Sequence, residues 1–133
     1  MMMRYPDIAF QVPHPMPFNP EYTTDEPSRS EIDAQPGATV LEFGSPWCGH
    51  CRRAAPLVAE AFSDHDGIRH IKIADSSGRP LGRSFGIKLW PTLIFLKDGR
   101  EIGRLVRPTG GDEIKNAMQA LDLPAGIRDA GPT

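Results

Sequence analysis

The chain has 133 residues, of which 39% are hydrophobic, and its 15 basic and 17 acidic side chains give a formal net charge of −2. This length predicts one domain with enough chain to bury a core without cross-links, and the near balance of charge argues against nucleic acid or an anionic membrane as the main partner. The two cysteines, Cys48 and Cys51, form one C-x-x-C motif, which argues against a disulfide-stapled secreted scaffold and for redox or metal chemistry.

Residues 1–26 predict an extended, proline-rich arm. Five prolines exclude a regular helix here, and they interrupt the apolar run of ~7–15 residues that a signal peptide needs: Pro6, Pro13, Pro15, Pro17 and Pro20. The sequence shows no transmembrane segment, so we expect a cytoplasmic protein. The composition leaves two alternatives: the arm is disordered or loosely packed, or it packs its aromatic side chains on the domain, namely Tyr5, Phe10, Phe18 and Tyr22.

The domain is expected over residues 27–124, with a frayed tail at 125–133. A short helix capped by Asp25 or Ser28 precedes Gly37, and the short apolar run at 40–43 predicts a buried strand. Beyond Pro46, apolar residues recur at three- and four-residue spacing, which predicts a helix ending near residues 65–67: Cys51, Ala54, Ala55, Val58, Ala61 and Phe62. The two cysteines therefore lie in the first turn of that helix.

The second half of the domain predicts alternating strands and helices, so the fold class is α/β. A strand at 68–73 should run parallel to the first, because a helix connects them. A turn at 75–78, a short helix at 81–85 closed by Gly86, and strands at 92–97 and 100–106 joined by Asp98-Gly99 follow. The last helix begins at Gly111 or Asp112, ends before Pro124, and has one apolar face made of Ile114, Ala117, Met118 and Leu121.

The position of the cysteines indicates thiol chemistry, because the free N–H groups and dipole of a helix N-terminus favour a thiolate. We expect Cys48 to be the more exposed and more acidic thiol, with a pKa of roughly 3.5–7.5. Cys51 lies one turn deeper, faces the core and can resolve a mixed disulfide formed by Cys48. The alternative is a zinc site, but no second paired motif is formed by His14, His50, His65 and His70, and we expect no metal.

The motif Trp47-Cys48-Gly49-His50-Cys51, with Pro56 after it and the distant segment Trp90-Pro91-Thr92 before a strand, resembles the thioredoxin family over roughly residues 28–123. The resemblance implies a thioredoxin fold, with a central mixed β-sheet flanked by helices, and a cis Pro91 packed against the disulfide. It also implies that Glu42 and Lys72 are a buried acid and a lysine that together move protons to and from Cys51.

Both of these assignments have a structural alternative. Glu42 lies in an otherwise apolar strand, and an ionisable group is rarely buried without a partner, so a register that turns it to solvent is the alternative. Lys72, between two isoleucines, has the same ambiguity. If both point inward, their pairing would lower the cost of burying either and leave a proton acceptor near Cys51.

The substrate groove is expected to use residues around the dithiol: Trp47, Gly49, His50, Trp90, Pro91 and Arg107. The two tryptophans could instead be ordinary core aromatics. A partly protonated His50 would favour the thiolate, and the Gly-His pair resembles that of protein disulfide isomerases. Three departures from the family affect substrate choice: Trp90 replaces a small or β-branched residue, Gly44 replaces an aromatic, and Arg107-Pro108 replaces a glycine. Together with Arg52 and Arg53, Arg107 could form a basic rim that selects an acidic or extended partner, or the arginines could simply be solvated.

Three classes of function follow. The first is a monomeric thiol–disulfide oxidoreductase that reduces protein disulfides through Cys48 and Cys51, is recharged by an upstream reductase, and needs no cofactor beyond its own disulfide. The second is a disulfide oxidant or isomerase, suggested by His50. The third is a polypeptide-binding module in which the dithiol is incidental.

Overall fold

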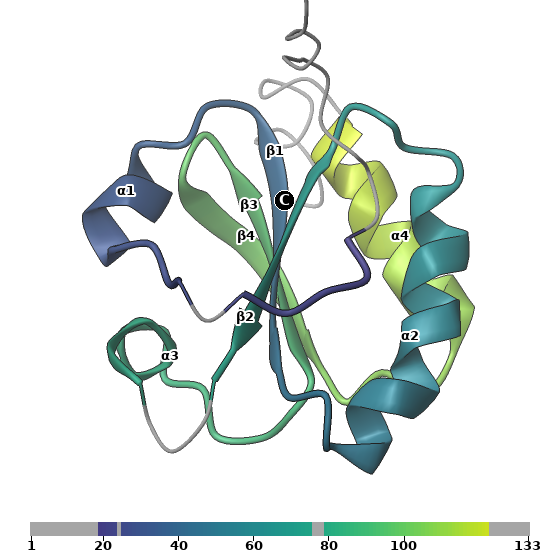
Figure 1. The fold of residues 1–133 in the computed structure, drawn as a ribbon. Coiled ribbons are helices and arrows are strands. Elements are labelled where there is room, and N and C mark those ends of the chain that lie inside the picture. The colour runs from purple at the N-terminus through teal and green to yellow at the C-terminus, as the bar shows by residue number, and fades with distance from the viewer. Residues whose placement is uncertain (1–18, 24, 76–78, 123–133) are drawn as a thin grey trace, which may run out of the picture.

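The computed structural model describes residues 19–23, 25–75 and 79–122. Four strands in these residues form one mixed sheet, in the order β2-β1-β3-β4. The strands are β1 (Ala38–Gly44), β2 (Arg69–Ala74), β3 (Thr92–Lys97) and β4 (Arg100–Val106). The helices are α1 (Arg29–Asp33), α2 (Gly49–Phe62), α3 (Pro80–Ser84) and α4 (Gly111–Asp122). Helices α2 and α4 cover one face of the sheet, and α1 and α3 lie on the other (Figure 1).

The strand pairing follows from the connections. Strand β1 pairs with β2 in parallel, as the helix between them requires, and with β3 antiparallel. Strands β3 and β4 form a hairpin whose turn residues Asp98 and Gly99 both have positive φ, 51° and 82°. An Asp-Gly pair suits such a turn, because its twist matches that of the strands.

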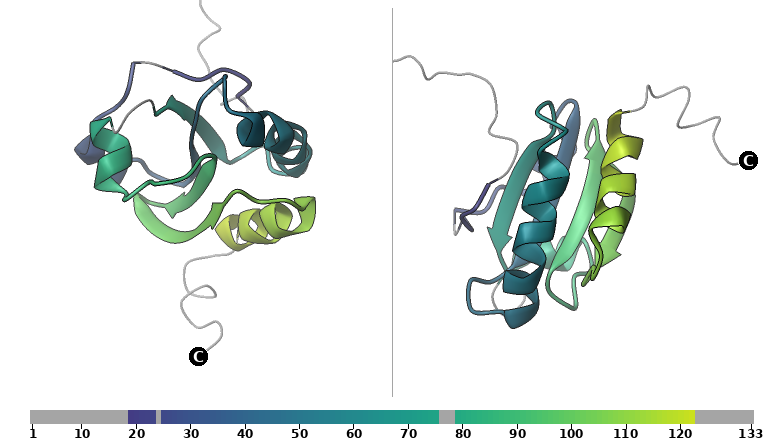
Figure 2. Two further views of the ribbon diagram at one scale, coloured as in Figure 1. Left: turned by 90° about the horizontal axis from the view of Figure 1, so that it is seen from below. Right: turned by 90° about the vertical axis from the view of Figure 1, so that its right-hand side faces the viewer.

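Because successive side chains of β1 point to opposite faces, the central strand takes part in both cores. The core under α2 and α4, which lie side by side in Figure 2, contains Val40, Val58, Ala61, Phe62, Ile68, Leu93, Phe95, Ile114, Met118 and Leu121. The core on the α1 and α3 face contains Ile32, Leu41, Phe43, Ile73, Leu81, Phe85, Ile94 and Leu96. Both faces of β1 are therefore covered, and Glu42 is buried on the face shared with Val40.

Most predicted elements are confirmed, with shifts at their ends. Strands β3 and β4 and helix α4 have the predicted bounds, whereas β2 begins at Arg69 and α2 ends at Phe62. Ser28, not Asp25, caps α1, because its side chain accepts from the Glu31 N–H. Residues 76–78 of the predicted turn, the tail at 125–133, and Tyr5, Phe10 and Phe18 lie outside the described residues. None of the helices within the described ranges combines the length and apolar content that crossing a bilayer demands.

The described end of the arm packs on the domain. The N–H of Thr23 donates to the Lys72 carbonyl at 2.7 Å, and the N–H of Ala74 donates to the Thr23 carbonyl at 3.0 Å. This parallel bridge ties the segment to β2, and in Figure 1 the segment crosses in front of that strand. Of the two alternatives for the arm, packing on the domain therefore holds for Tyr22.

Candidate active site

The two thiols lie at the N-terminus of α2 in different environments. Cys48 is the N-cap residue, and its sulfur accepts a hydrogen bond from the Cys51 N–H at 3.2 Å. The side chain of Cys48 is half-buried, whereas Cys51 is 2% exposed; both are free thiols. The predicted arrangement is confirmed: an accessible sulfur at the mouth and a buried sulfur one turn below it.

Burial controls the acidity of the deeper thiol. It raises the pKa of Cys51 to about 11, with a further rise from the adjacent Cys48 side chain. Hydrogen bonds with the Ser45 backbone and the Tyr22 side chain act in the opposite direction. Cys51 therefore carries its proton at neutral pH, and an attack by its sulfur requires that the proton be removed.

A cis peptide bond between Trp90 and Pro91 faces the dithiol, as predicted. The Cys48 thiol contacts the Trp90 carbonyl oxygen at 3.9 Å, and Pro91 is buried. The indole of Trp90 packs partly against the core on the α1 and α3 face, and its N–H donates to Asp75 Oδ2 at 3.0 Å. Trp90 thus presents its carbonyl group to Cys48, while its indole is anchored to Asp75.

The buried acid has a partner that the sequence did not predict. Glu42 is 1% exposed, and its Oε1 accepts from His70 Nε2 at 2.8 Å. His70 Nδ1 accepts from the Asn19 N–H at 2.8 Å, so the imidazole proton lies on Nε2. The ring of His70 stacks on Phe62, with 4.7 Å between the centroids. Glu42 Oε2 has no hydrogen-bond partner among the described residues, so half of the carboxylate remains available.

Lys72 points to the same face of the sheet but makes different contacts from those predicted. It lies opposite Glu42 in the register of β1 and β2. Its Nζ donates to the Pro20 carbonyl at 3.2 Å and lies 4.4 Å from the centroid of the Tyr22 ring. Lys72 therefore holds the segment that carries Tyr22, while His70 takes the hydrogen-bonding role at Glu42 that we expected from Lys72.

A second residue missed from the sequence, Tyr22, reaches the dithiol from the arm. A Cβ atom on Gly44 would lie 2.8 Å from the Tyr22 hydroxyl and 2.7 Å from the Cys51 sulfur. Burial, followed by the charge of Glu42, raises the pKa of Tyr22, so its hydroxyl keeps its proton. This hydroxyl lies within hydrogen-bonding reach of Cys51.

A model of the Thioredoxin family matches residues 19–120, a range that includes Tyr22, both cysteines and Pro91. The chain belongs to the thioredoxin family. Its mixed sheet with helices on both faces is the thioredoxin fold, as the sequence predicted.

Individual relatives agree with this membership. The solved structure of thioredoxin 2 from Pseudomonas aeruginosa PAO1, in its reduced form, is 48% identical, covers 78% of this chain and 96% of that one, and has a TM-score of 0.71. Thioredoxin 1 of Synechococcus elongatus is 30% identical over 96 residues, which are 71% of this chain and 90% of that protein. Protein disulfide-isomerase A3 of Gallus gallus is also 30% identical, over 105 residues, but this chain spans only 21% of its length.

The remaining predicted groove residues of this thioredoxin-family protein are exposed to solvent. Trp47 is 86% exposed, which is unusual for so large an apolar side chain and is typical of a contact surface. Gly49 and His50 are exposed at the first turn of α2, and Arg107 is exposed in the loop after β4. The exposed groups at the dithiol are thus an indole, an imidazole and a guanidinium.

The electrostatics of His50 differ from our expectation. The charge of Arg107 is the main cause that lowers the pKa of His50, with smaller contributions from desolvation and Arg53. Arg53 lies 3.0 Å from His50 Nδ1, a contact in which the guanidinium is the donor. His50 is therefore mainly neutral at neutral pH, and the positive charge on this side of the dithiol is carried by the two arginines beside it.

Proposed function

We propose that this protein reduces protein disulfides by thiol–disulfide exchange and is itself recharged by an upstream reductase. The Cys48 thiolate attacks one sulfur of the target disulfide, forms a mixed disulfide and releases the first substrate thiolate. Deprotonated Cys51 then attacks the Cys48 sulfur, closes the Cys48–Cys51 disulfide and releases the second. Two electrons pass to the substrate, whose thiolates take up protons, and the reductase restores the dithiol.

The observation that carries this proposal is that the two cysteine sulfurs differ in solvent exposure and in the charge state that their surroundings favour. Cys48 is accessible and accepts the Cys51 N–H, an arrangement that stabilises negative charge on its sulfur. Cys51 is buried and protonated, so it can act only after Cys48 has brought a substrate to it. Glu42 Oε2 has no hydrogen-bond partner among the described residues, so we assign this carboxylate oxygen as the acceptor of the Cys51 proton.

A second candidate function is that of a disulfide oxidant or isomerase, and two observations support it. The Gly49-His50 pair lies between the cysteines, and the chain is 30% identical to protein disulfide-isomerase A3 over 105 residues. Positive charge from Arg53 and Arg107 would stabilise the dithiol form and make the disulfide more oxidising. A reduction potential well above the cytosolic glutathione poise of about −220 to −260 mV would favour this candidate.

The exchange reaction is tested by trapping. A Cys51→Ser variant should hold substrate proteins through Cys48 in a mixed disulfide that a reductant releases and mass spectrometry identifies. The matched control is the Cys48→Ser, Cys51→Ser double variant, which keeps the groove but has no nucleophile. Equal capture by both would overturn the exchange mechanism and favour a polypeptide-binding module. Fractionation of cells, together with the sedimentation of the purified chain, tests our further proposal of a monomer that works in the cytoplasm.

A further inference from the structure

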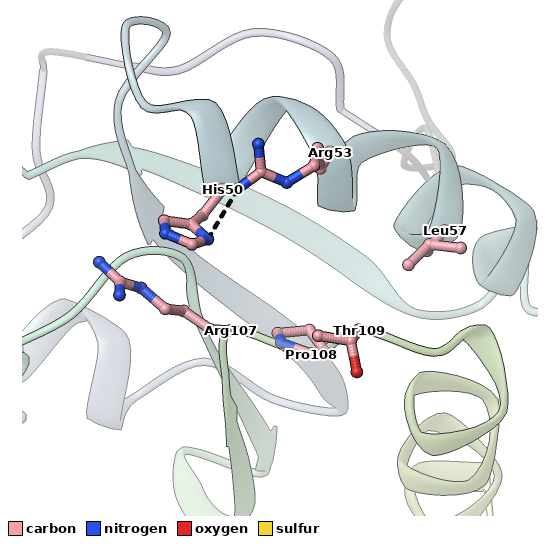
Figure 3. A pocket seen from close by; sticks show the side chains of 6 residues that line it. All are labelled: His50, Arg53, Leu57, Arg107, Pro108 and Thr109. Carbon is pink, nitrogen blue, oxygen red and sulfur yellow. Dashed lines mark hydrogen bonds between the residues drawn. The ribbon is translucent and has the colours of Figure 1, made fainter.

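A pocket of about 330 Å³ lies beside the dithiol, between α2 and the loop that joins β4 to α4. It is lined by His50, Arg53, Leu57, Arg107, Pro108 and Thr109. Figure 3 shows that the side chains of Arg53 and Arg107 approach the His50 ring from the two walls. The polar lining of this pocket is therefore dominated by hydrogen-bond donors that carry positive charge.

Arg107 is held in place by the backbone of the cis-proline segment. Its Nε donates to the Trp90 carbonyl at 2.8 Å, and its own N–H donates to the Pro91 carbonyl at 2.8 Å. The residue has a φ of 51°, which costs about 1–2 kcal/mol for a residue other than glycine. Arg107 thus occupies a position where glycine would be less strained, and its terminal N–H groups lie beside the pocket.

The positive charge of the pocket is not neutralised within it. No carboxylate is among its lining residues, and within residues 19–23, 25–75 and 79–122 neither Arg53 nor Arg107 forms an ion pair. Glu113 lies near the Thr109 wall, but its Oε2 accepts from the N–H groups of Thr109 and Gly110, at 3.0 and 3.3 Å. A bound anion would therefore gain charge-assisted hydrogen bonds.

The pocket also adjoins the nucleophile. The Trp90 carbonyl oxygen is contacted by Arg107 Nε at 2.8 Å and by the Cys48 thiol at 3.9 Å. We propose that this pocket binds a carboxylate side chain of the substrate polypeptide, so that disulfides flanked by Asp or Glu are reduced preferentially. This inference rests on the proposed exchange reaction and names the class of substrate for it.

The test uses three peptides with the same internal disulfide, flanked by Glu, Gln or Lys. The wild-type protein should reduce them with kcat/KM in the order Glu, Gln, Lys. In Arg53→Gln and Arg107→Gln the ratio of kcat/KM for the Glu peptide to that for the Gln peptide should fall about tenfold, the size expected for one charge-assisted pair. Because both rates are measured on the same variant, any change in the reactivity of Cys48 cancels in this ratio. Arg107→Gly is a second variant for the same loss, because glycine accepts the positive φ and the fold should persist.

The matched control is Arg100→Gln, which removes the same charge from an exposed position at the opposite end of β4. It should keep the wild-type preference. Equal reduction of the three peptides by the wild-type protein, or an unchanged preference in both pocket variants, would overturn the carboxylate site and leave the exchange reaction intact. Failure to reduce any of the peptides would overturn the exchange reaction and the substrate class together.

Discussion

The hydroxyl of Tyr22 fills the space beside the Cys51 sulfur that is open because residue 44 is glycine. The thioredoxin family usually has an aromatic residue at that position, within the strand that leads to the dithiol. Here the ring comes from the segment that pairs with β2, and the Nζ of Lys72 lies over it, 4.4 Å from its centroid. The end of the arm is therefore part of the redox site.

Removing only this hydroxyl should slow the second step of the exchange. In Tyr22→Phe the ring remains, but the interaction that lowers the pKa of Cys51 is lost, so less of the thiol is ionised at neutral pH. One hydrogen bond corresponds to about 2- to 10-fold in the rate of mixed-disulfide resolution. Stopped-flow measurement of the release of a coloured thiol from Cys48 tests this. An unchanged resolution rate, with the first attack also unchanged, would remove Tyr22 from the mechanism.

The complementarity of Tyr22 and Gly44 can be tested by stability. In Gly44→Ala the new methyl group would lie 2.7 Å from the Cys51 sulfur and 2.8 Å from the Tyr22 hydroxyl, so both side chains must move. We expect the free energy of unfolding to fall by about 1–3 kcal/mol in urea titrations. The same substitution in a Tyr22→Ala background should cost less, with a coupling of at least about 0.5 kcal/mol. Additive effects would show that the two residues do not share this space.

The sequence was sufficient for the fold because its signals are local. The apolar run in β1, the Asp98-Gly99 turn and the apolar face of α4 each act within a few residues. The thiol pair follows from a motif of fixed spacing, whereas the cis Pro91 was implied by the resemblance to the thioredoxin family. The roles of Tyr22 and His70 were not predicted, since each depends on how a segment distant in sequence lies against β1 or β2.

One signal for His70 was present in the sequence. His70 and Lys72 alternate with isoleucines, which places both on one face of a strand, and the parallel neighbour brings Glu42 to the same face. Tyr22 had no comparable signal: nothing in the spacing shows that the arm returns to the site and compensates for Gly44. The basic pocket could be predicted in part. The sequence indicates Arg53 and Arg107 as candidates for a basic rim, but only the folded chain shows that they line one pocket.

The pair of Glu42 and His70 should behave as a buried hydrogen-bonded unit. In His70→Leu the carboxylate would lose its partner on Oε1 while Oε2 already has none among the described residues, so we expect a loss of about 1–3 kcal/mol in urea unfolding. The double variant Glu42→Leu, His70→Leu should recover most of this stability, because both polar groups are gone. It should nevertheless resolve mixed disulfides slowly, since its proton acceptor is missing.

Two results would contradict this assignment. A His70→Leu variant as stable as the wild type would show that the carboxylate does not depend on the imidazole. A double variant that resolves mixed disulfides at the wild-type rate would show that Glu42 is not the proton acceptor for Cys51.

Asp75 should reduce stability at neutral pH. It is 4% exposed, and burial raises its pKa although the Trp90 indole N–H donates to Oδ2; its Oδ1 has no hydrogen-bond partner among the described residues. Because the folded pKa lies above the unfolded value of about 3.9, the folded state binds more protons between the two values. Its contribution to stability therefore falls as the pH rises through this window and stays low above it.

The neutral isostere Asn should remove this effect, because its amide oxygen can still accept from Trp90. We expect Asp75→Asn to unfold at a higher urea concentration than the wild type at neutral pH, and the difference to shrink at a pH of about 3, where the wild-type carboxyl is protonated in both states. Glu26→Gln is the control. It removes a nearby carboxylate that raises the pKa of Asp75 but leaves the buried acid in place, so the decrease in stability with rising pH should persist. A wild-type protein more stable than Asp75→Asn at neutral pH would mean that the charged carboxylate stabilises the fold through Trp90, and that burial does not govern this site.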